Sequence, residues 1–287
     1  MIVREQPALH LTYCLNVHPG ETWAENLDAI REKAGAVRRR IAPGSPFGLG
    51  LRLSRQAAEE LAAGDRLSEF RDVMESRGLY AFTINGFPYG RFHGAPVKAE
   101  VYAPDWRTPE RCDYTCLLAD LLAELLPAGV TGSISTVPVS YKPWAIGESG
   151  VEQACRMLCD TVAHLAQIRD RTGVEIHIGL EPEPDCLVET TAEAVAFFDG
   201  PLAKHGLEHL RKQHGLGRSE AREILDRHVG ICVDTAHAAV EFERPAEVLA
   251  KFAQKGIRVS KIQLSSALRV RVDRGARSLE ELRAFCD

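Results

Sequence analysis

Short apolar runs alternate with longer stretches of helical period along the chain. The apolar runs predict seven strands, at His10–Val17, Phe47–Leu53, Tyr80–Asn85, Gly132–Val139, Glu175–Leu180, Val229–Asp234 and Val259–Leu264. Apolar residues at helical spacing predict helices at Thr22–Arg39, Gln56–Ala63, Arg66–Arg77, Pro109–Leu126, Gly150–Arg171, Thr191–His205, Arg218–Arg227, Pro245–Lys255 and Ser278–Phe285. Strands that alternate with helices pair in parallel, because a parallel pair needs a long crossover connection.

Two folds compete for this pattern. A doubly wound nucleotide-binding sheet has GxGxxG after its first strand, whereas this chain continues Asn16-Val-His18-Pro-Gly. A βα-barrel gathers its functional groups at the C-terminal ends of many strands. Polar residues follow six of the predicted strands: Asn16, His18, Asn85, Lys142, Glu181, Glu183, Asp234, His237, Gln263 and Ser265. We therefore expect one α/β domain over residues 1–287, folded as a TIM-type (β/α) barrel.

Alternation within the strands supports the barrel. In the fifth predicted strand, Ile176, Ile178 and Leu180 share one face, while His177 and Gly179 share the other. The sixth predicted strand alternates in the same way. A bulky apolar face suits packing on helices, and a face of small and polar residues suits a barrel interior.

Three strand ends carry the candidate chemistry. Glu181 lies in Gly-Leu-Glu-Pro-Glu-Pro-Asp, Asp234 in Ile-Cys-Val-Asp-Thr-Ala-His, and Gln263 in Lys-Ile-Gln-Leu-Ser-Ser. Two carboxylates and an amide oxygen at neighbouring strand ends suit Mg²⁺ or Mn²⁺, and with His237 the set also suits Zn²⁺ or Co²⁺. The pattern predicts a divalent-metal site with Glu181, Asp234 and Gln263 as ligands.

Each of these residues also has a structural interpretation. Glu181 can be an ordinary loop carboxylate, and Gln263 can be a structural hydrogen-bonding group. Asp234 can be the N-cap of a following helix, because a carboxylate accepts the first backbone N–H groups. The matched positions on consecutive strands favour a shared metal site over three unrelated roles.

A long segment, Gly86–Trp106, follows the third predicted strand without helical period. Segments of this kind are often lids or binding loops, and this one carries several aromatic and basic residues. The alternative is that the aromatics only anchor the loop to the barrel. Together with the polar strand ends, the loop predicts substrate contacts from Asn16, His18, Asn85, His93, Lys142 and Trp144.

The motifs at the strand ends resemble those of a known superfamily. Leu-Glu-Pro, Val-Asp-Thr-Ala-His and Ile-Gln-Leu-Ser resemble the metal-binding strand ends of the xylose-isomerase-like barrel superfamily, which includes sugar isomerases and epimerases. The resemblance implies a divalent metal held by Glu181, Asp234 and Gln263. It further implies that His237 contacts substrate or metal and that Glu181 moves a proton. The superfamily more often has histidine where this chain has Gln263.

Longer segments resemble one branch of that superfamily, the EboE-type metabolite-traffic proteins. These segments are His10–Trp23, Phe82–Gly94, Val97–Trp106 and Lys261–Leu268. The resemblance covers nearly the whole chain and implies a role in moving a metabolite precursor toward the periplasm.

The eighth strand of the barrel is not recognisable. In the superfamily this strand supplies a final glutamate. Here Leu264 is followed by Ser-Ser-Ala-Leu-Arg-Val-Arg-Val-Asp-Arg and then by a helical stretch. We expect a C-terminally incomplete chain, with the gap filled by a further segment or by a partner chain, rather than direct pairing of the first and seventh strands.

Composition narrows the function classes. The 35 basic and 40 acidic residues give a net charge of −5, which argues against a nucleic-acid partner and against a metal-dependent endonuclease. The absence of a long apolar run predicts no membrane span, and the N-terminus lacks an apolar signal core, so we expect a cytoplasmic protein. Eight cysteines without a CxxC motif fit free thiols in a reducing compartment.

Two functions follow from these patterns. The first is a metal-dependent isomerase or epimerase that handles a small, polar, sugar-like metabolite. The second is a non-catalytic metabolite-binding or carrier protein on the same fold. An oligomer is compatible with either.

Overall fold

The computed structural model describes residues 1–6, 8–90 and 98–270, and its centre is a seven-stranded parallel sheet in sequential order. The strands are β3 (Thr12–Cys14), β4 (Phe47–Arg52), β5 (Leu79–Asn85), β6 (Gly132–Thr136), β7 (Ile176–Leu180), β8 (Val229–Asp234) and β9 (Val259–Gln263). Every neighbouring pair is parallel. This is the strand order of a βα-barrel, so the prediction of a TIM-type fold with one strand missing is confirmed.

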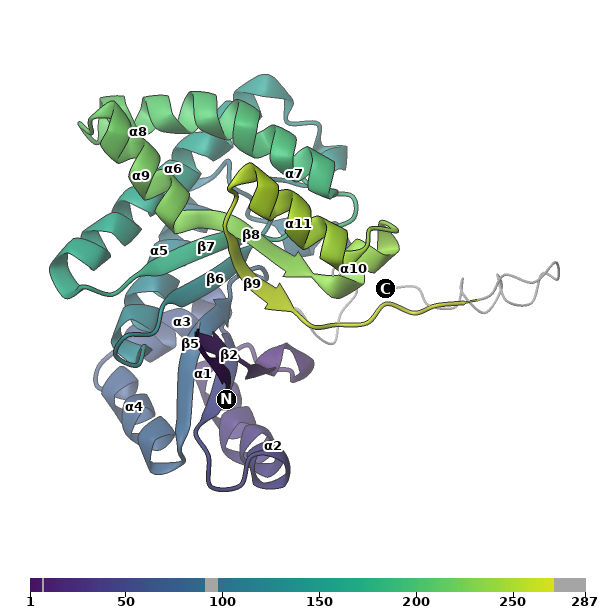
Figure 1. Ribbon diagram of the computed structural model, residues 1–287. Helices are drawn as coiled ribbons and strands as arrows, with labels where there is room; N and C mark the ends of the chain where they lie inside the picture. The colour runs from purple at the N-terminus through teal and green to yellow at the C-terminus, as the bar shows by residue number, and fades with distance from the viewer. Residues whose placement is uncertain (7, 91–97, 271–287) are drawn as a thin grey trace.

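Helices follow the strands and surround the sheet (Figure 1). They are α1 (Trp23–Ala29), α2 (Gly35–Ile41), α3 (Arg55–Ala62), α4 (Arg66–Ser76), α5 (Pro109–Leu125), α6 (Gly147–Thr172), α7 (Thr191–Phe197), α8 (Leu207–Gln213), α9 (Arg218–His228), α10 (Thr235–Val240) and α11 (Pro245–Lys255). None of the helices in the described ranges combines the length and apolar character needed to cross a bilayer.

Side chains across the barrel interior show that the sheet is curled. Lys261 Nζ on β9 donates to Thr83 Oγ1 on β5 at 3.3 Å. These strands are four places apart, so in a flat sheet they would be separated by about 19 Å. Ser133 Oγ on β6 also donates to Thr83 Oγ1, at 2.8 Å. The predicted small and polar face is therefore the barrel interior, while Ile178 and its outward neighbours are fully buried on the other side.

The strands β3 and β9 are the two edges of the described sheet. The strand β6, in the middle, is buried at every residue, whereas β9 is only partly buried and Ile262 is 44% exposed. The sheet is therefore not closed between β3 and β9 in the described residues, in agreement with the expected gap.

A hairpin that the sequence did not predict precedes β3 and contacts the start of β5. The strands β1 (Ile2–Glu5) and β2 (Ala8–His10) pair in antiparallel fashion, and His10 Nδ1 lies 3.1 Å from the Tyr80 hydroxyl at the start of β5. The hairpin takes up the beginning of the predicted strand His10–Val17. That prediction was too long at its other end as well, because residues after Cys14 form a 3₁₀ turn, η1 (Leu15–Val17).

The predicted helix Thr191–His205 is also different in the structure. It starts as α7 but passes into a π-helical segment, η5 (Phe198–Gly206), before continuing as α8. Pro201 lies inside η5. Proline removes one helical N–H and clashes with the preceding turn, and the wider π turn accommodates it within a continuing helix. The predicted stretch Ser278–Phe285 lies outside the described residues.

Candidate functional site at the barrel mouth

Three predicted metal ligands meet at the C-terminal ends of the strands. Glu181 directly follows β7, Asp234 ends β8, and Gln263 ends β9. Gln263 Nε2 donates to Glu181 Oε1 at 2.5 Å and to Asp234 Oδ2 at 3.3 Å. Parallel strands bring their ends to the same edge of the sheet, so the structure places these side chains together as the sequence pattern indicated.

His237 and Glu183 lie beside this trio. His237, on the short helix after Asp234, has its Nδ1 3.1 Å from Glu183 Oε2 and 3.9 Å from Glu181 Oε1. The same nitrogen lies 3.0 Å from the carbonyl oxygen of Pro182. Candidate ligand atoms of Glu181, Glu183 and His237 all lie within 4.8 Å of one another. We call Glu181, Glu183, Asp234, His237 and Gln263 the mouth cluster.

Burial controls the protonation of the mouth cluster. It raises the pKa of Glu181, which is 4% exposed, and it raises the pKa of Glu183 to about 8. Burial works against charging of His237, but the carboxylates of Glu183, Glu181 and Asp234 outweigh it, so the pKa of His237 is raised. Acidic groups are therefore crowded where water screens them poorly, an arrangement that favours bound protons or a bound cation.

The donor set fits a divalent metal. Glu181 Oε2 is buried and lacks a hydrogen-bond partner among the described residues, and an unpaired buried carboxylate oxygen is costly unless a cation or proton compensates it. Asp234 directs Oδ2 toward the same region. Rotation of the Gln263 amide by 180° would present its oxygen in place of its nitrogen, an orientation that neighbouring groups determine. These residues can supply oxygen ligands on one side, with His237 available for an ion that accepts nitrogen.

The alternative role of Asp234 as a helix cap is also present. Its Oδ1 accepts hydrogen bonds from the backbone N–H of Ala236 at 2.8 Å and of His237 at 3.3 Å. Ser265 Oγ donates to the same oxygen at 2.5 Å. One carboxylate oxygen therefore caps α10 while the other faces Gln263, and the two interpretations from the sequence are compatible.

Three of the predicted substrate contacts, Asn16, His18 and Asn85, differ in their hydrogen-bond partners. Asn16, in η1, has its Oδ1 buried without a partner in the described structure. His18 Nε2 lies 2.8 Å from the Tyr13 hydroxyl. Asn85 Oδ1 accepts from the backbone N–H of Phe87 at 3.0 Å, which stabilises the turn after β5. Substrate contact by these residues stays a prediction.

The remaining predicted contacts lie after β6 and in the long loop. Lys142 makes ion pairs with Glu189 and, at 3.0 Å, with Glu193. Trp144 packs edge-on against Tyr141, with ring centroids 5.6 Å apart. His93 lies outside the described residues. The charge of Lys142 is thus balanced within the protein, which makes it a weaker anchor for an anionic substrate than its position in the sequence indicated.

The structure adds residues to the candidate site. Glu183 was recognised in the sequence only as a polar strand end, and its contact with His237 was not predicted. Lys261 lies two residues before Gln263 on the inward face of β9, and its charge favours ionisation of Glu181. Tyr102, from the long loop, has its pKa raised by burial and by the nearby Glu183. The two-residue period of β9 was the signal that could have identified Lys261.

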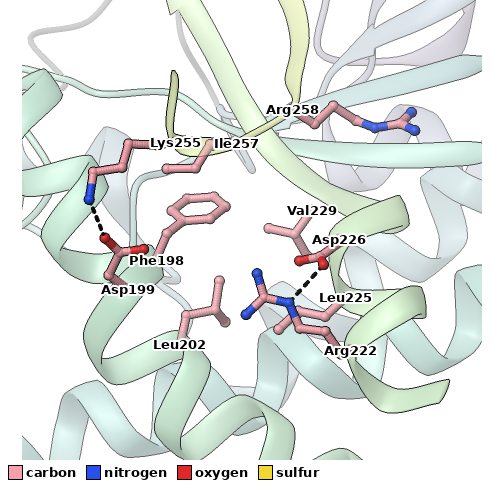
Figure 2. Close-up of a pocket in the computed structure, with 11 residues that line it drawn as sticks. Phe198, Asp199, Leu202, Arg222, Leu225, Asp226, Val229, Lys255, Ile257 and Arg258 are labelled. Atoms are coloured by element: carbon pink, nitrogen blue, oxygen red, sulfur yellow. Dashed lines mark hydrogen bonds and ion pairs between the residues drawn. The ribbon is translucent and has the colours of Figure 1, made fainter. Parts of the chain in front are cut away.

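A separate hollow lies near the starts of β8 and β9, away from the mouth cluster (Figure 2). Apolar side chains including Phe198, Leu202 and Ile257 line it. The charged groups at its rim are paired, with Lys255 2.9 Å from Asp199 and Arg222 2.7 Å from Asp226. Such a lining offers no concentration of uncompensated polar groups comparable to the mouth cluster.

Comparison with known proteins gives distant similarities only. No family model and no curated protein matches the chain. Similar solved structures include an IOLI protein with a bound zinc atom (14% identity, TM-score 0.48, 87% of this chain and 70% of that chain). They also include the 3-keto-D-glucoside 4-epimerase YcjR from E. coli (16%, 0.46, 95% and 98%). A third is a xylose isomerase domain protein from Alicyclobacillus acidocaldarius subsp. acidocaldarius (14%, 0.43, 88% and 93%). Similarity at this level does not identify the reaction, ligand or metal of this chain.

Proposed function

We propose that the mouth cluster forms the active site of a metal-dependent isomerase or epimerase for a small sugar-like metabolite. The observation that carries the proposal is the crowding of acidic side chains at the strand ends. Glu183, with its pKa near 8, lies 3.1 Å from His237, and Glu181 holds a buried, unpaired oxygen beside them. Clusters of ionisable groups with shifted pKa values are typical of catalytic sites.

Glu181, Asp234 and Gln263 would hold the metal, which would be Mg²⁺ or Mn²⁺ on these oxygen ligands alone and could also be Zn²⁺ or Co²⁺ if His237 joins them. When bound, a divalent ion at this position stabilises negative charge that develops on a substrate oxygen. The cap contacts at Oδ1 of Asp234 fix the orientation of that carboxylate, so its Oδ2 is held toward the other ligands.

Proton transfer would fall to the glutamates. A group whose pKa lies near the operating pH is the most effective general acid or base, and Glu183 meets this condition. Glu181, the base implied by the resemblance, is the alternative. The Nδ1 of His237 faces Glu183 and the Pro182 carbonyl, and these contacts orient the ring toward the site.

The substrate class follows from the same chemistry. An aldose or ketose offers neighbouring hydroxyl and carbonyl oxygens to a metal and a C–H or O–H proton to a carboxylate. Asn16, His18, Asn85, His93, Lys142 and Trp144 are the proposed substrate contacts. The resemblance to EboE-type proteins extends the proposal to a cytoplasmic role in metabolite-precursor trafficking.

A second candidate is a non-catalytic binding or carrier protein on the same barrel. It is favoured by Gln263 in place of a more usual histidine ligand. It is also favoured by the open sheet between β3 and β9, which leaves the barrel wall incomplete in the described residues. Under this proposal the mouth cluster binds metal and metabolite but moves no proton.

Calorimetric titration with Mn²⁺ tests the metal site. We expect binding to the wild type and loss of binding in Glu181→Gln and Asp234→Asn. Glu175→Gln is the matched control, since Glu175 directly precedes the same strand at the opposite end of the barrel. Equal affinity in all four proteins would refute the proposed ligands.

Hydrogen exchange separates the two functions. Metal-loaded protein is incubated in D₂O with a panel of aldoses, ketoses and their phosphates, and NMR follows the loss of carbon-bound protons. Exchange that disappears in Glu183→Gln or Glu181→Gln supports the isomerase or epimerase. Metabolite binding without any exchange supports the carrier instead.

A further inference from the structure

A second group of potential metal ligands lies among the helices outside the sheet. Asp160 is on α6, His209 is on α8, and His214 directly follows α8. We propose that these three residues bind a zinc-type divalent ion, at a site independent of the mouth cluster.

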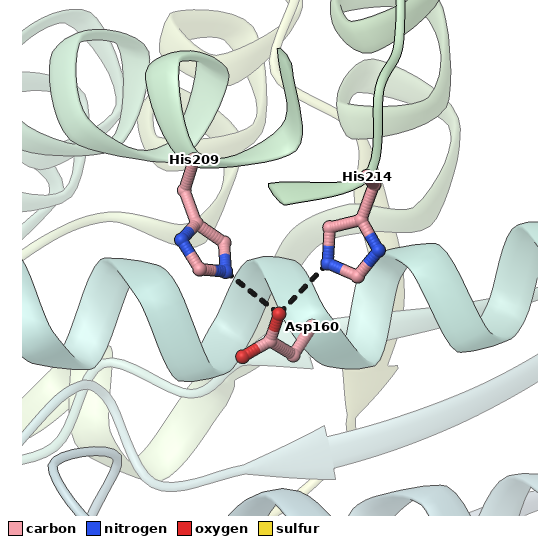
Figure 3. A group of neighbouring side chains, drawn as sticks. All are labelled: Asp160, His209 and His214. Carbon is pink, nitrogen blue, oxygen red and sulfur yellow. Dashed lines mark hydrogen bonds and ion pairs between the residues drawn. The ribbon is translucent and has the colours of Figure 1, made fainter. Parts of the chain in front are cut away.

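Both histidines direct a ring nitrogen at the same carboxylate oxygen. His209 Nε2 lies 2.7 Å from Asp160 Oδ1, and His214 Nε2 lies 2.8 Å from the same oxygen. Figure 3 shows both rings pointing toward this oxygen from α8 and the segment that follows it. The ring centroids are 5.7 Å apart with planes at 72°, so the rings approach from different directions.

The end of α8 is what brings the two histidines together. They are five residues apart, so in a continuous helix they would point in clearly different directions. The helix ends at Gln213, and His214 leaves the helical conformation with φ −102° and ψ 4°. Gly215 then has a positive φ of 69°, a conformation that glycine adopts readily. The turn swings His214 back toward α6.

The donor set selects the ion. Two imidazoles and one carboxylate are typical of Zn²⁺ and Co²⁺, whereas Mg²⁺ and Ca²⁺ take oxygen ligands. Ligand atoms around a tetrahedral zinc are separated by about 3.4 Å, given metal–ligand distances near 2.1 Å. The two observed nitrogen–oxygen separations, 2.7 and 2.8 Å, are shorter than this by well under 1 Å, so a small rotation of the histidine side chains would admit an ion between the three groups.

Exposure allows an ion to enter. The side chains of His209, His214 and Asp160 are 15%, 25% and 28% exposed. A water molecule can therefore complete the coordination, as in open zinc sites with three protein ligands. An ion at this position would fix the end of α8 to the middle of α6.

The same helix provides a matched control. His164, on α6, lies 2.8 Å from Asp120 on α5 and is 26% exposed, but it belongs to a pair rather than to a group of three ligands. Substitution of His164 removes a comparable histidine–carboxylate contact without touching the proposed site.

Equilibrium dialysis of the full chain with Zn²⁺ at pH 7.5 tests the proposal. The measurements use the Glu181→Gln background, which removes the proposed metal site of the mouth. We expect about one Zn²⁺ per chain in this background and with His164→Gln added. Adding His209→Gln or His214→Gln should weaken binding by at least about tenfold, the size of effect that even outer-shell changes have on metal sites. Circular dichroism confirms that each variant is folded.

A spectroscopic readout distinguishes a metal site from a hydrogen-bonded triad. In the triad both Nε2 atoms carry protons to one oxygen, whereas metal ligation requires both nitrogens to be deprotonated. We expect Zn²⁺ to shift the ¹⁵N resonances of the Nε2 atoms of two histidines, which are assigned by their loss in His209→Gln and His214→Gln. Unchanged resonances, or equal Zn²⁺ binding in all variants, would overturn the proposal and leave the mouth site untouched.

Discussion

A glutamate flanks β7 at each end, and the two glutamates have opposite electrostatic surroundings. Glu175 directly precedes the strand and Glu181 directly follows it. Glu175 accepts from Arg227 at 2.9 Å and from Arg258 at 3.1 Å. Burial opposes its ionisation, but the two arginines outweigh burial and lower its pKa. Glu181 has no arginine partner in the described structure, and burial raises its pKa.

This difference between Glu175 and Glu181 indicates that one end of β7 contributes to stability and the other to function. At the N-terminal end the charges are balanced, as expected of the barrel face that contributes to stability. At the mouth, acidic groups are kept close together at a cost in stability, as is common where a protein retains groups for binding or catalysis. Substitutions at the two ends should therefore change the free energy of unfolding in opposite directions.

The largest effect should appear in the pH dependence of the metal-free protein. The pKa of Glu183 is raised from 4.5 to about 8 in the folded state. Between these values the folded protein keeps a proton that the unfolded chain has released. The stabilisation from this group is therefore complete below pH 4.5 and is lost as the pH rises to about 8. At about 1.4 kcal/mol per pH unit the loss is on the order of 4 kcal/mol.

Urea denaturation of wild type and Glu183→Gln across this pH range measures the effect. The difference in unfolding free energy between the two proteins should change by a few kcal/mol from pH 5 to pH 8. A difference that is independent of pH would show that Glu183 ionises normally. Saturating Mn²⁺ should reduce the loss at pH 8, because a cation favours the ionised carboxylates.

The second largest effect on the free energy of unfolding is expected at Glu175, where the charges are balanced. Glu175→Gln should lower the free energy of unfolding by about 2 kcal/mol, because it leaves Arg227 and Arg258 without their shared carboxylate. Glu223→Gln is the control, since Glu223 also pairs with Arg227, at 3.0 Å, but is 63% exposed. Exposed pairs of this kind contribute about 0.5 kcal/mol or less. Equal losses in the two variants would argue against a special role for Glu175.

The third effect has the opposite sign, because here the substitution stabilises the protein. Glu181→Gln should raise the unfolding free energy of the metal-free protein by about 1 kcal/mol, because a neutral amide replaces a buried carboxylate of which only one oxygen accepts a hydrogen bond from Gln263. Thermal melts at pH 8 with a chelator present measure it. Destabilisation by Glu181→Gln would contradict the contrast between the two ends of β7.

The sequence predicted several elements and the meeting of three strand ends. The strand Val229–Asp234 and the helix Pro245–Lys255 have the predicted bounds. The convergence of Glu181, Asp234 and Gln263 follows from parallel strands alone, because such strands end at one edge. No long-range contact had to be known.

Contacts that depend on short or irregular elements could not be predicted. His237 reaches Glu183 from α10, a six-residue helix too short to show a hydrophobic period. Asp160 and His209 are almost fifty residues apart, and they meet only because α8 packs on α6 after the π-helical segment. Local patterns carry no information about such packing.

The smallest effect on stability separates the two roles of Asp234. Asparagine caps helices about as well as aspartate, so Asp234→Asn should change the unfolding free energy by a few tenths of a kcal/mol, whereas Asp234→Ala should cost about 1 kcal/mol. Both variants remove a charged ligand, so both should weaken Mn²⁺ binding by at least about tenfold. Urea denaturation and calorimetric titration on the same preparations measure the two quantities. If Asp234→Asn binds Mn²⁺ as the wild type does while Asp234→Ala loses only stability, Asp234 is a helix cap alone, and the metal site must be sought among Glu181, Glu183 and His237.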